Sequence, residues 1–390
     1  MKSATISASH KNQLRTAFGP LLPFIRFLRI LPARLHAGQQ ASKLRSHKTN
    51  TSICYLTNNF PNRPALRTEI AGGGAVKLTF LAESFPHSYP NASILYTVSS
   101  VDHFARPIIL RTARQKGLKV VLNQNGVAYL AWHGPGWEEP NKKLRAAYEQ
   151  ADFIVYQSNF CKESARIFLG ESSAPSQVIY NPVDTNLYQP VQKNLPRRGP
   201  VLLLGGNQYE RYRLESAIQI FKQITTHLPD AHLLITGRLW GDDQNVSMAI
   251  AKQALLKLGI EDLVEFTGSY TQASAPLIFQ RADILIHTKY NDPSPNLIAE
   301  SLASGLPVVY SASGGVPELV GKDAGIGLPV EQSWEKISLP DTQAMALAAV
   351  NIWENYKDFS NAARQQAEQQ FALDKFILAH RELFSSLMDR

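Results

Sequence analysis

Cysteine is scarce in this sequence, and the two that occur, Cys54 and Cys161, are too far apart to suggest a metal-binding pair. Two isolated cysteines also form no disulfide framework, so the simplest interpretation is a protein of a reducing compartment. No apolar run reaches the roughly 18 residues that indicate a transmembrane helix. We therefore predict no membrane-spanning helix and expect a cytoplasmic protein.

Acidic residues are absent from the first fifty positions, whereas nine basic residues occur there. The formal net charge of the whole chain is +8, so subtracting these nine charges leaves about −1 for the remainder. The excess positive charge thus lies in one segment, and we do not expect the remainder of the chain to bind nucleic acid. The nine residues are Lys2, Lys11, Arg15, Arg26, Arg29, Arg34, Lys43, Arg45 and Lys48.

This segment, residues 1–50, contains the apolar stretch FGPLLPFIRFLRILPARL, which three arginines interrupt. Charges at such positions argue against a secretory signal peptide. A basic amphipathic segment on the inner face of an anionic membrane is one interpretation, with contact through residues 15–35. A disordered tail is the alternative. Three prolines in the stretch argue against one continuous helix.

The rest of the chain has the length and composition of a folded two-domain protein. It has 390 residues in total, of which 44% are hydrophobic and 18% charged. Predicted strands and helices alternate, which favours α/β domains with parallel, doubly wound sheets. We predict a first domain over residues 51–190, a second over 191–345, and C-terminal helices over 346–390. The linker near residue 190 is polar and rich in proline, as domain boundaries tend to be.

One stretch, residues 282–330, organises the second domain. It begins with the strand ADILIHT, crosses the loop NDPSPN, and continues into a helix from Asn296 to about Ser304. Gly305, the strand PVVYS and the loop SGGVPE follow. The helix N-terminus lies at the carboxyl end of a strand, where α/β sheets bind ligands and where free N–H groups attract anions. Asp292 and Glu300, eight positions apart, are expected to border one phosphate-sized hollow.

This pattern resembles the donor-site motif of glycosyltransferase family 4, whose members have the GT-B fold. The matching residues here are Asp292, Glu300, the run ASGLPVV, and the loop from Gly314 to Glu318. The first acid of this motif is more often Glu in the family, and the shorter Asp292 puts the preferred sugar in question. The resemblance implies two Rossmann-like domains facing a cleft, with C-terminal helices that cross back to the first domain.

The resemblance also implies roles for individual residues. Asp292 would contact the donor sugar as a catalytic residue, and Glu300 would bind the ribose of the nucleotide. Arg211 and Arg213 match the positions that hold the donor diphosphate, and which of the two does so stays open. Further donor contacts are expected from Pro295, Asn296, Leu297, Gly206, Arg238 and Gly268.

The first domain offers candidates for the acceptor side of the cleft. Gly73 and Gly74 belong to a triple glycine after the first strand, which lets a ligand approach the backbone or forms a plain turn. The predicted loop NQNGVAYLAWHGPGWEEPNKKL, residues 123–144, combines amides with aromatic rings, a combination that suits carbohydrate. We expect Asn125 and Trp132 to face the cleft and His133 to assist catalysis, although a lone histidine is more often structural.

The leading hypothesis is a glycosyltransferase (EC 2.4, hexosyltransferase type) that moves a sugar from a nucleoside-diphosphate sugar to a hydroxyl of a glycan or lipid-linked saccharide, as in polysaccharide biosynthesis. The resemblance implies retention at the anomeric carbon, and we expect no metal and no cofactor. The Asp242–Asp243 pair is weak evidence for a metal site. The alternatives are a nucleotide-sugar epimerase or hydrolase and a non-catalytic GT-B partner protein that binds the nucleotide sugar.

Overall fold

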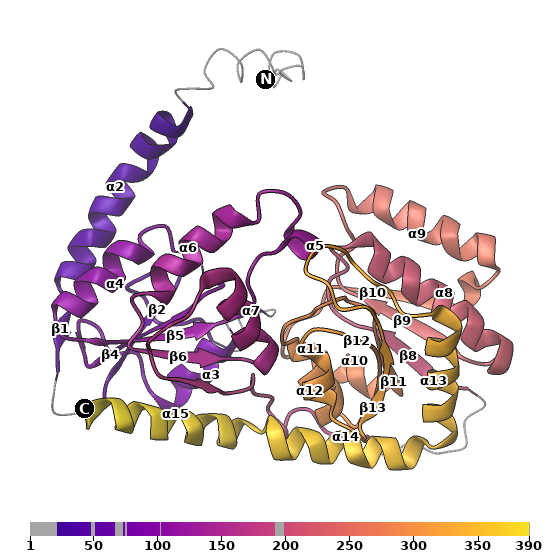
Figure 1. The fold of residues 1–390 in the computed structure, drawn as a ribbon. Coiled ribbons are helices and arrows are strands. Elements are labelled where there is room, and N and C mark those ends of the chain that lie inside the picture. The colour runs from indigo at the N-terminus through magenta and orange to yellow at the C-terminus, as the bar shows by residue number, and fades with distance from the viewer. Residues whose placement is uncertain are drawn as a thin grey trace, which may run out of the picture.

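A computed structural model shows two parallel β-sheets, each covered by helices on both faces (Figure 1). It describes residues 22–47, 51–66, 73–74, 76–101, 103–191 and 199–389, with backbone alone for residues 22–30. Within these ranges, none of the helices combines the length and hydropathy that crossing a membrane requires.

The first sheet has five parallel strands in the order β2-β4-β5-β6-β7. Its strands follow one another in chain order, and helices cover both of its faces. A two-residue ladder of β1 and β3 lies at its edge. The strands are β1 (Arg45–Ser46), β2 (Ile53–Leu56), β3 (Asn91–Ala92), β4 (Ile94–Val98), β5 (Lys119–Gln124), β6 (Phe153–Tyr156) and β7 (Ser176–Val178).

Apolar side chains alternate between the two faces of the first sheet and bury it on both sides. Tyr55 and Tyr96 point to the face that α3 and the C-terminal helix α15 cover, while Cys54 and Leu95 point to the face of α2 and α4. The helices of this domain are α2 (Leu22–Ser42), α3 (Val76–Ser84), α4 (Arg106–Gln115), α5 (Leu130–His133), α6 (Glu138–Tyr148) and α7 (Asn159–Leu169).

The second sheet has six parallel strands in the order β10-β9-β8-β11-β12-β13. Its order reverses at β8, so here the doubly wound topology is confirmed, and the carboxyl ends of β8 and β11 form the switch point where such sheets bind ligands. The strands are β8 (Val201–Leu204), β9 (His232–Thr236), β10 (Val264–Gly268), β11 (Ile284–His287), β12 (Val308–Ala312) and β13 (Gly325–Pro329).

The helices of the second domain pack on both faces of this sheet. α13 lies against α8 in one apolar core, and α11 lies against α14 in the other. The predicted helix after the loop NDPSPN is confirmed, because α11 begins at Asn296. The helices are α8 (Arg211–His227), α9 (Gln244–Leu258), η3 (Glu261–Leu263), α10 (Ala275–Arg281), α11 (Asn296–Ala303), α12 (Val316–Val320) and α13 (Thr342–Glu354).

The last two helices, α14 (Tyr356–Gln370) and α15 (Leu373–Met388), run along the base of both domains (Figure 1). α14 stays with the second domain, whereas α15 places Phe376, Leu383 and Phe384 in the core of the first. The predicted crossing of the C-terminal helices is therefore confirmed.

Two local predictions are wrong. A single helix, α2, spans Leu22–Ser42 with Pro32 inside it, although the prolines argued against continuity. Its last turns pack on α4 and bury Ala37 and Ala41, and this packing offsets the backbone bond that Pro32 cannot make. The loop expected before residue 144 contains α5 and the start of α6, whose Pro140 sits in the first turn, where its missing N–H costs little.

The linker expected near residue 190 falls largely on residues 192–198, which lie outside the described residues. The domain boundaries at residues 50, 190 and 345 therefore stay predictions.

Candidate functional site

The loop between β11 and α11, residues 288–295, carries a carboxylate whose pKa is strongly lowered. Asp292 is buried there, and its Oδ2 lies 3.4 Å from both His287 Nε2 and Lys289 Nζ. Burial alone would raise the pKa of Asp292, but Lys289, His287 and Arg213 together outweigh it and hold this pKa well below its usual range. Asp292 is therefore an ionised, buried carboxylate among cationic groups.

Arg213, in the first turn of α8, is buried close to the same loop. Its Nη1 donates to the carbonyl of Asn207 at 2.7 Å, and its own carbonyl accepts from Thr288 Oγ1. Its Nε, like both ring nitrogens of His287, is buried without a hydrogen-bond partner among the described residues. Buried polar groups are normally paired, so these nitrogens are suited to the polar atoms of a ligand. Burial, more than the opposing pull of Asp292, lowers the pKa of His287.

Arg211, two residues earlier, is directed elsewhere. Its Nε donates to Glu215 Oε1 at 2.7 Å, and its guanidinium lies 5.6 Å from the centre of the Trp240 ring. Both partners of this ion pair are half exposed. The two arginines that the sequence left equivalent thus differ, and Arg213 is the one near Asp292.

Glu300 is buried in the body of α11. Its Oε1 accepts a hydrogen bond from Gln272 Nε2 at 3.0 Å, and the amide oxygen of Gln272 accepts from the Tyr188 hydroxyl. Burial raises the pKa of Glu300, although hydrogen bonds from Gln272 and Tyr188 oppose the shift. The Gln272 side chain fixes one of the two carboxylate oxygens of Glu300.

Glycine backbones meet at the carboxyl ends of β8, β9 and β10. Gly237 N donates to the Gly268 carbonyl, and a Cβ on Gly237 would lie 2.4 Å from the Gly206 carbonyl. Gly205 leaves similarly little space beside Leu297 in the first turn of α11, where a Cβ would lie 2.5 Å from the leucine side chain. The expected donor residues Gly206, Gly268 and Leu297 therefore lie at one sheet edge. Arg238 is exposed, and its backbone N–H donates to Asn207 Oδ1.

A cavity of about 200 Å³ lies between the two domains and opens onto Asp292. The first domain contributes a polar and aromatic wall that includes Asn125 and Trp132. His133 is exposed and does not line the cavity, so its catalytic role stays a prediction. Glu300 does not line it either. The lining residues are Ser100, Asn125, Gly126, Val127, Tyr129, Trp132, Phe160, Lys289, Asn291, Asp292 and Pro293.

On the first-domain side, the glycine loop packs directly behind this wall. A Cβ on Gly74 would lie 2.1 Å from Ser100 Oγ and 2.9 Å from Asn125 Nδ2, so only glycine fits there. Gly73 has a φ of +79° and open space around it. Lys77, the second residue of α3, is buried and donates to the side-chain oxygens of Asn123 and Asn125. Burial lowers the pKa of Lys77 to about 7.

The first domain also holds the β11–α11 loop by its backbone. Tyr129 Oη donates to the Asn291 carbonyl at 3.2 Å, and Ser158 Oγ donates to the Pro293 carbonyl at 2.6 Å. Asn181 Nδ2 donates to the Ser294 carbonyl at 3.2 Å. Three backbone carbonyls of the loop thus accept hydrogen bonds from side chains of the opposite domain.

Sequence reasoning missed Lys77, His287 and Lys289. His287 is the last residue of a strand that reads as apolar, and Lys289 precedes Asp292 by three positions in an irregular loop. A positive residue beside a candidate carboxylate was the available signal for Lys289. Lys77 gave none, because a lysine in an apolar helix reads as exposed.

Asp243, from the acidic pair considered as a metal site, accepts hydrogen bonds from the first N–H groups of α9 and acts as the N-cap of this helix.

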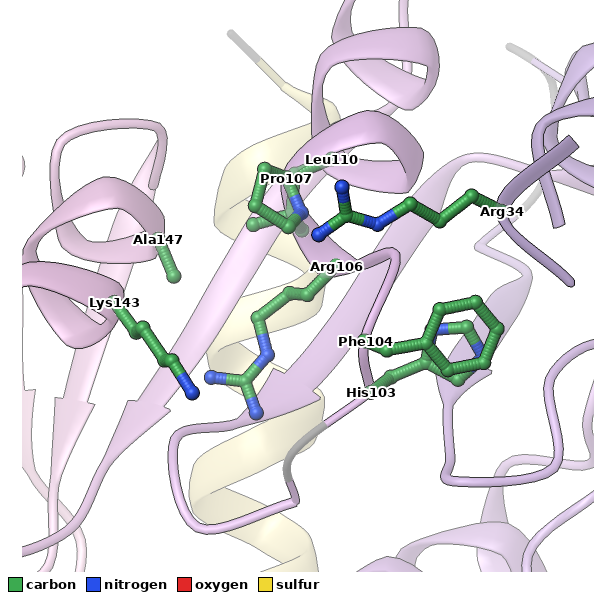
Figure 2. Close-up of a pocket in the computed structure, with 8 residues that line it drawn as sticks. All are labelled: Arg34, His103, Phe104, Arg106, Pro107, Leu110, Lys143 and Ala147. Carbon is green, nitrogen blue, oxygen red and sulfur yellow. The ribbon is translucent and has the colours of Figure 1, made fainter. Parts of the chain in front are cut away.

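A second cavity, of about 340 Å³, lies between α2, the start of α4 and α6 (Figure 2). Figure 2 shows the cationic ends of Arg106 and Lys143 turned toward the same space. Arg34, His103 and Arg106 already have interaction partners, however, so these charges do not amount to an open anion site.

Comparison with known proteins agrees with this geometry. Residues 189–366 match the family model described as Glycosyl transferases group 1. The putative glycosyltransferase YtcC of Bacillus subtilis is 25% identical over 265 residues, which span 63% of this chain and 64% of that protein. The aligned part is thus less than two thirds of this relative's length.

Solved structures share the fold. Sucrose-phosphate synthase from Thermosynechococcus elongatus superposes with a TM-score of 0.61 at 18% identity, covering 81% of this chain and 78% of that one. Anabaena HepE in complex with UDP-glucose superposes with a TM-score of 0.58 at 19% identity, covering 75% of this chain and 79% of HepE. The predicted resemblance and fold are confirmed: residues 189–366 match the model of the glycosyl transferases group 1 family, and the chain has the GT-B fold.

Proposed function

We propose that this protein transfers a sugar from a nucleoside-diphosphate sugar to a hydroxyl acceptor. One observation carries the proposal: ionised Asp292 lies beside His287 and Lys289 at the rim of an interdomain cavity, and the buried Nε of nearby Arg213 has no hydrogen-bond partner in the described residues. Such donors suit the oxygens of a sugar and a diphosphate.

Charge development during transfer fits these groups. Departure of a nucleoside diphosphate builds negative charge, which Arg213, Lys289 and the N-terminus of α11 are placed to stabilise. Asp292 would hold the donor sugar, and the free carboxylate oxygen of Glu300 would bind the ribose. Retention of configuration and independence from metal are part of the proposal and come from the family resemblance.

The first domain would bind the acceptor. The exposed ring of Trp132 offers a face for stacking on a sugar, and Asn125 and Ser100 offer polar contacts beside it. We propose a glycan or lipid-linked saccharide as acceptor. Basic residues 15–35 would bring the protein to the inner face of a membrane, where a lipid-linked acceptor lies.

Relatives support a nucleotide-sugar donor. HepE, which has the same fold, was crystallised with UDP-glucose, and the curated relative YtcC is described as a putative glycosyltransferase. A uridine nucleotide is accordingly the first donor to test, with GDP and ADP conjugates beside it.

A thermal-shift screen tests the donor site. UDP, GDP, ADP and their glucose conjugates are added at millimolar excess, without metal and then with magnesium. One of the three nucleotides, with its glucose conjugate, is expected to raise the melting midpoint without metal. A ligand that binds only the folded state stabilises that state by mass action. Glu300→Gln should abolish most of this shift, whereas Glu382→Gln, on the exposed side of α15, should keep it.

Two outcomes contradict the proposal. No shift with any nucleotide would favour a non-catalytic partner protein. A shift followed by formation of an epimer or free sugar, with no transfer to any hydroxyl compound, would favour an epimerase or a hydrolase.

A further inference from the structure

A buried polar network runs from the C-terminal helix α15 through the first sheet to the cleft, and Lys77 lies in it. His380 Nε2 and the Tyr96 hydroxyl are 2.9 Å apart, and Asn123 Nδ2 donates to that hydroxyl at 3.0 Å. Lys77 Nζ then donates to Asn123 Oδ1 at 3.0 Å and to Asn125 Oδ1 at 3.3 Å. Of these residues, only Asn125 lines the cavity.

The lysine decides which way each amide points. In its ammonium form Lys77 has only N–H donors, and it is too buried to reach solvent, so both asparagine oxygens face it. Asn and Gln amides are otherwise ambiguous in orientation, and a charged donor removes the ambiguity. In the flipped orientation the amide N–H₂ of Asn125 would oppose the donor of Lys77.

The consequence at the cleft is a pair of donors. With Oδ1 turned to Lys77, Asn125 Nδ2 donates one proton to Ser100 Oγ at 2.7 Å. A primary amide has a second proton, and the Ser100 hydroxyl, having accepted, keeps its own proton to donate. Both residues line the interdomain cavity. Gly74 permits this packing, because a side chain there would displace Ser100 and the amide.

We propose that Lys77 is a positioning residue for acceptor binding. It holds Asn125 with its amide nitrogen toward the cleft, so that Asn125 and Ser100 together donate to oxygens of a saccharide acceptor. This inference rests on the proposed function for its ligand but not for its geometry. Lys77 touches neither substrate, and it acts through Asn125.

The first arm of the test needs no substrate. In protein labelled with ¹⁵N-asparagine, the side-chain amide of Asn125 is identified as the signal pair lost in Asn125→Asp. In Lys77→Met this pair should change chemical shift, and its protons should exchange with water about tenfold faster, since one oriented hydrogen bond contributes roughly that factor. Tyr96→Phe cuts the network on the other side of Lys77 and should leave the Asn125 pair unchanged.

The second arm measures transfer from UDP-glucose to a panel of p-nitrophenyl glycosides. Lys77→Met and Asn125→Asp should each raise the KM for the acceptor about tenfold and leave the KM for the donor within about twofold. Asn125→Asp keeps a partner for Lys77 and so serves if Lys77→Met folds poorly. Tyr96→Phe should lower the melting midpoint and leave the acceptor KM unchanged.

The outcomes separate the two claims. An unchanged Asn125 amide signal in Lys77→Met, or equal rises in donor and acceptor KM, overturns the positioning role. If the wild-type protein transfers sugar to no glycoside, the proposed function fails there, while the amide signal still confirms or overturns the orientation that Lys77 imposes.

Discussion

At the scale of single residues, the site is defined by how few partners its buried charges have. Asp292 lies 3.4 Å from both Lys289 Nζ and His287 Nε2, a distance at which charges attract but hydrogen bonds are weak. A bound donor sugar and diphosphate would supply closer partners to the same groups. The apo arrangement is thus electrostatically prepared for a ligand that carries both hydroxyls and negative charge.

Asp292→Asn should therefore reduce sugar transfer by about 100-fold, because a neutral amide lacks the charge that orders Lys289 and His287 around the sugar. Transfer rate is measured at saturating donor, and nucleotide binding is measured separately by thermal shift. Asp242→Asn, an exposed acid on the same domain, is the matched control and should keep the wild-type rate. Transfer by Asp292→Asn at the wild-type rate would refute the assigned role.

The candidate site shows what a sequence can and cannot reveal at this scale. Asp292, Asn125 and Trp132 could be proposed from the sequence, because each follows the carboxyl end of a predicted strand of the parallel sheets. The separation of Arg211 from Arg213 was not, since one turn of helix decides which arginine pairs with Glu215 and which faces the loop. Long-range pairing, as between Lys77 and Asn125, leaves no local pattern.

At the scale of elements, proline and glycine positions predicted the two ends of α11, because Pro295 precedes its first residue and Gly305 follows its end. The same rule failed at α2 and α6, where Pro32 and Pro140 lie inside helices. Tertiary packing stabilised α2 and first-turn placement tolerated Pro140, and neither is visible in local sequence. The short helix α12 was expected as part of the loop SGGVPE, and it contributes a contact between the two domains.

α12 brings Glu318 to the N-terminus of α7 in the other domain. The carboxylate of Glu318 accepts from the backbone N–H groups of Asn159 and Phe160 at 3.0 and 3.1 Å, and Ser158 caps the next N–H. A carboxylate at a helix N-terminus is stabilised both by hydrogen bonds and by the helix dipole. Glu318 therefore links the two domains through one helix end.

Glu318→Gln should cost about 1 kcal/mol of unfolding free energy and increase the radius of gyration in solution, because an uncharged amide holds α7 less strongly. Thermal denaturation and small-angle scattering measure the two effects. Glu331→Gln removes another glutamate of the second domain, one paired with exposed Lys336, and should change neither quantity. An unchanged radius and midpoint in Glu318→Gln would exclude the interdomain link.

At the scale of the whole molecule, the chain joins its domains twice, once at the linker and once through α14 and α15 (Figure 1). Arg364 of α14 donates to the carbonyls of Thr185, Tyr188 and Ala303, so this helix is fastened to both the linker region and α11. α15 then completes the core of the first sheet. The core of the first domain is consequently completed by a helix from the far end of the sequence.

This dependence leads to a prediction for Phe384, which is fully buried against Tyr96 and Phe85. Phe384→Ala should destabilise the first domain by about 3–5 kcal/mol, the usual cost of a cavity left by a buried phenylalanine. Scanning calorimetry should then show the first domain melting before the second, with a nucleotide raising only the later transition. Leu378→Ala, on the exposed side of α15, is the control and should melt like the wild type. A single lowered transition in Phe384→Ala, shifted as a whole by the nucleotide, would instead mean that the two domains unfold as one cooperative unit.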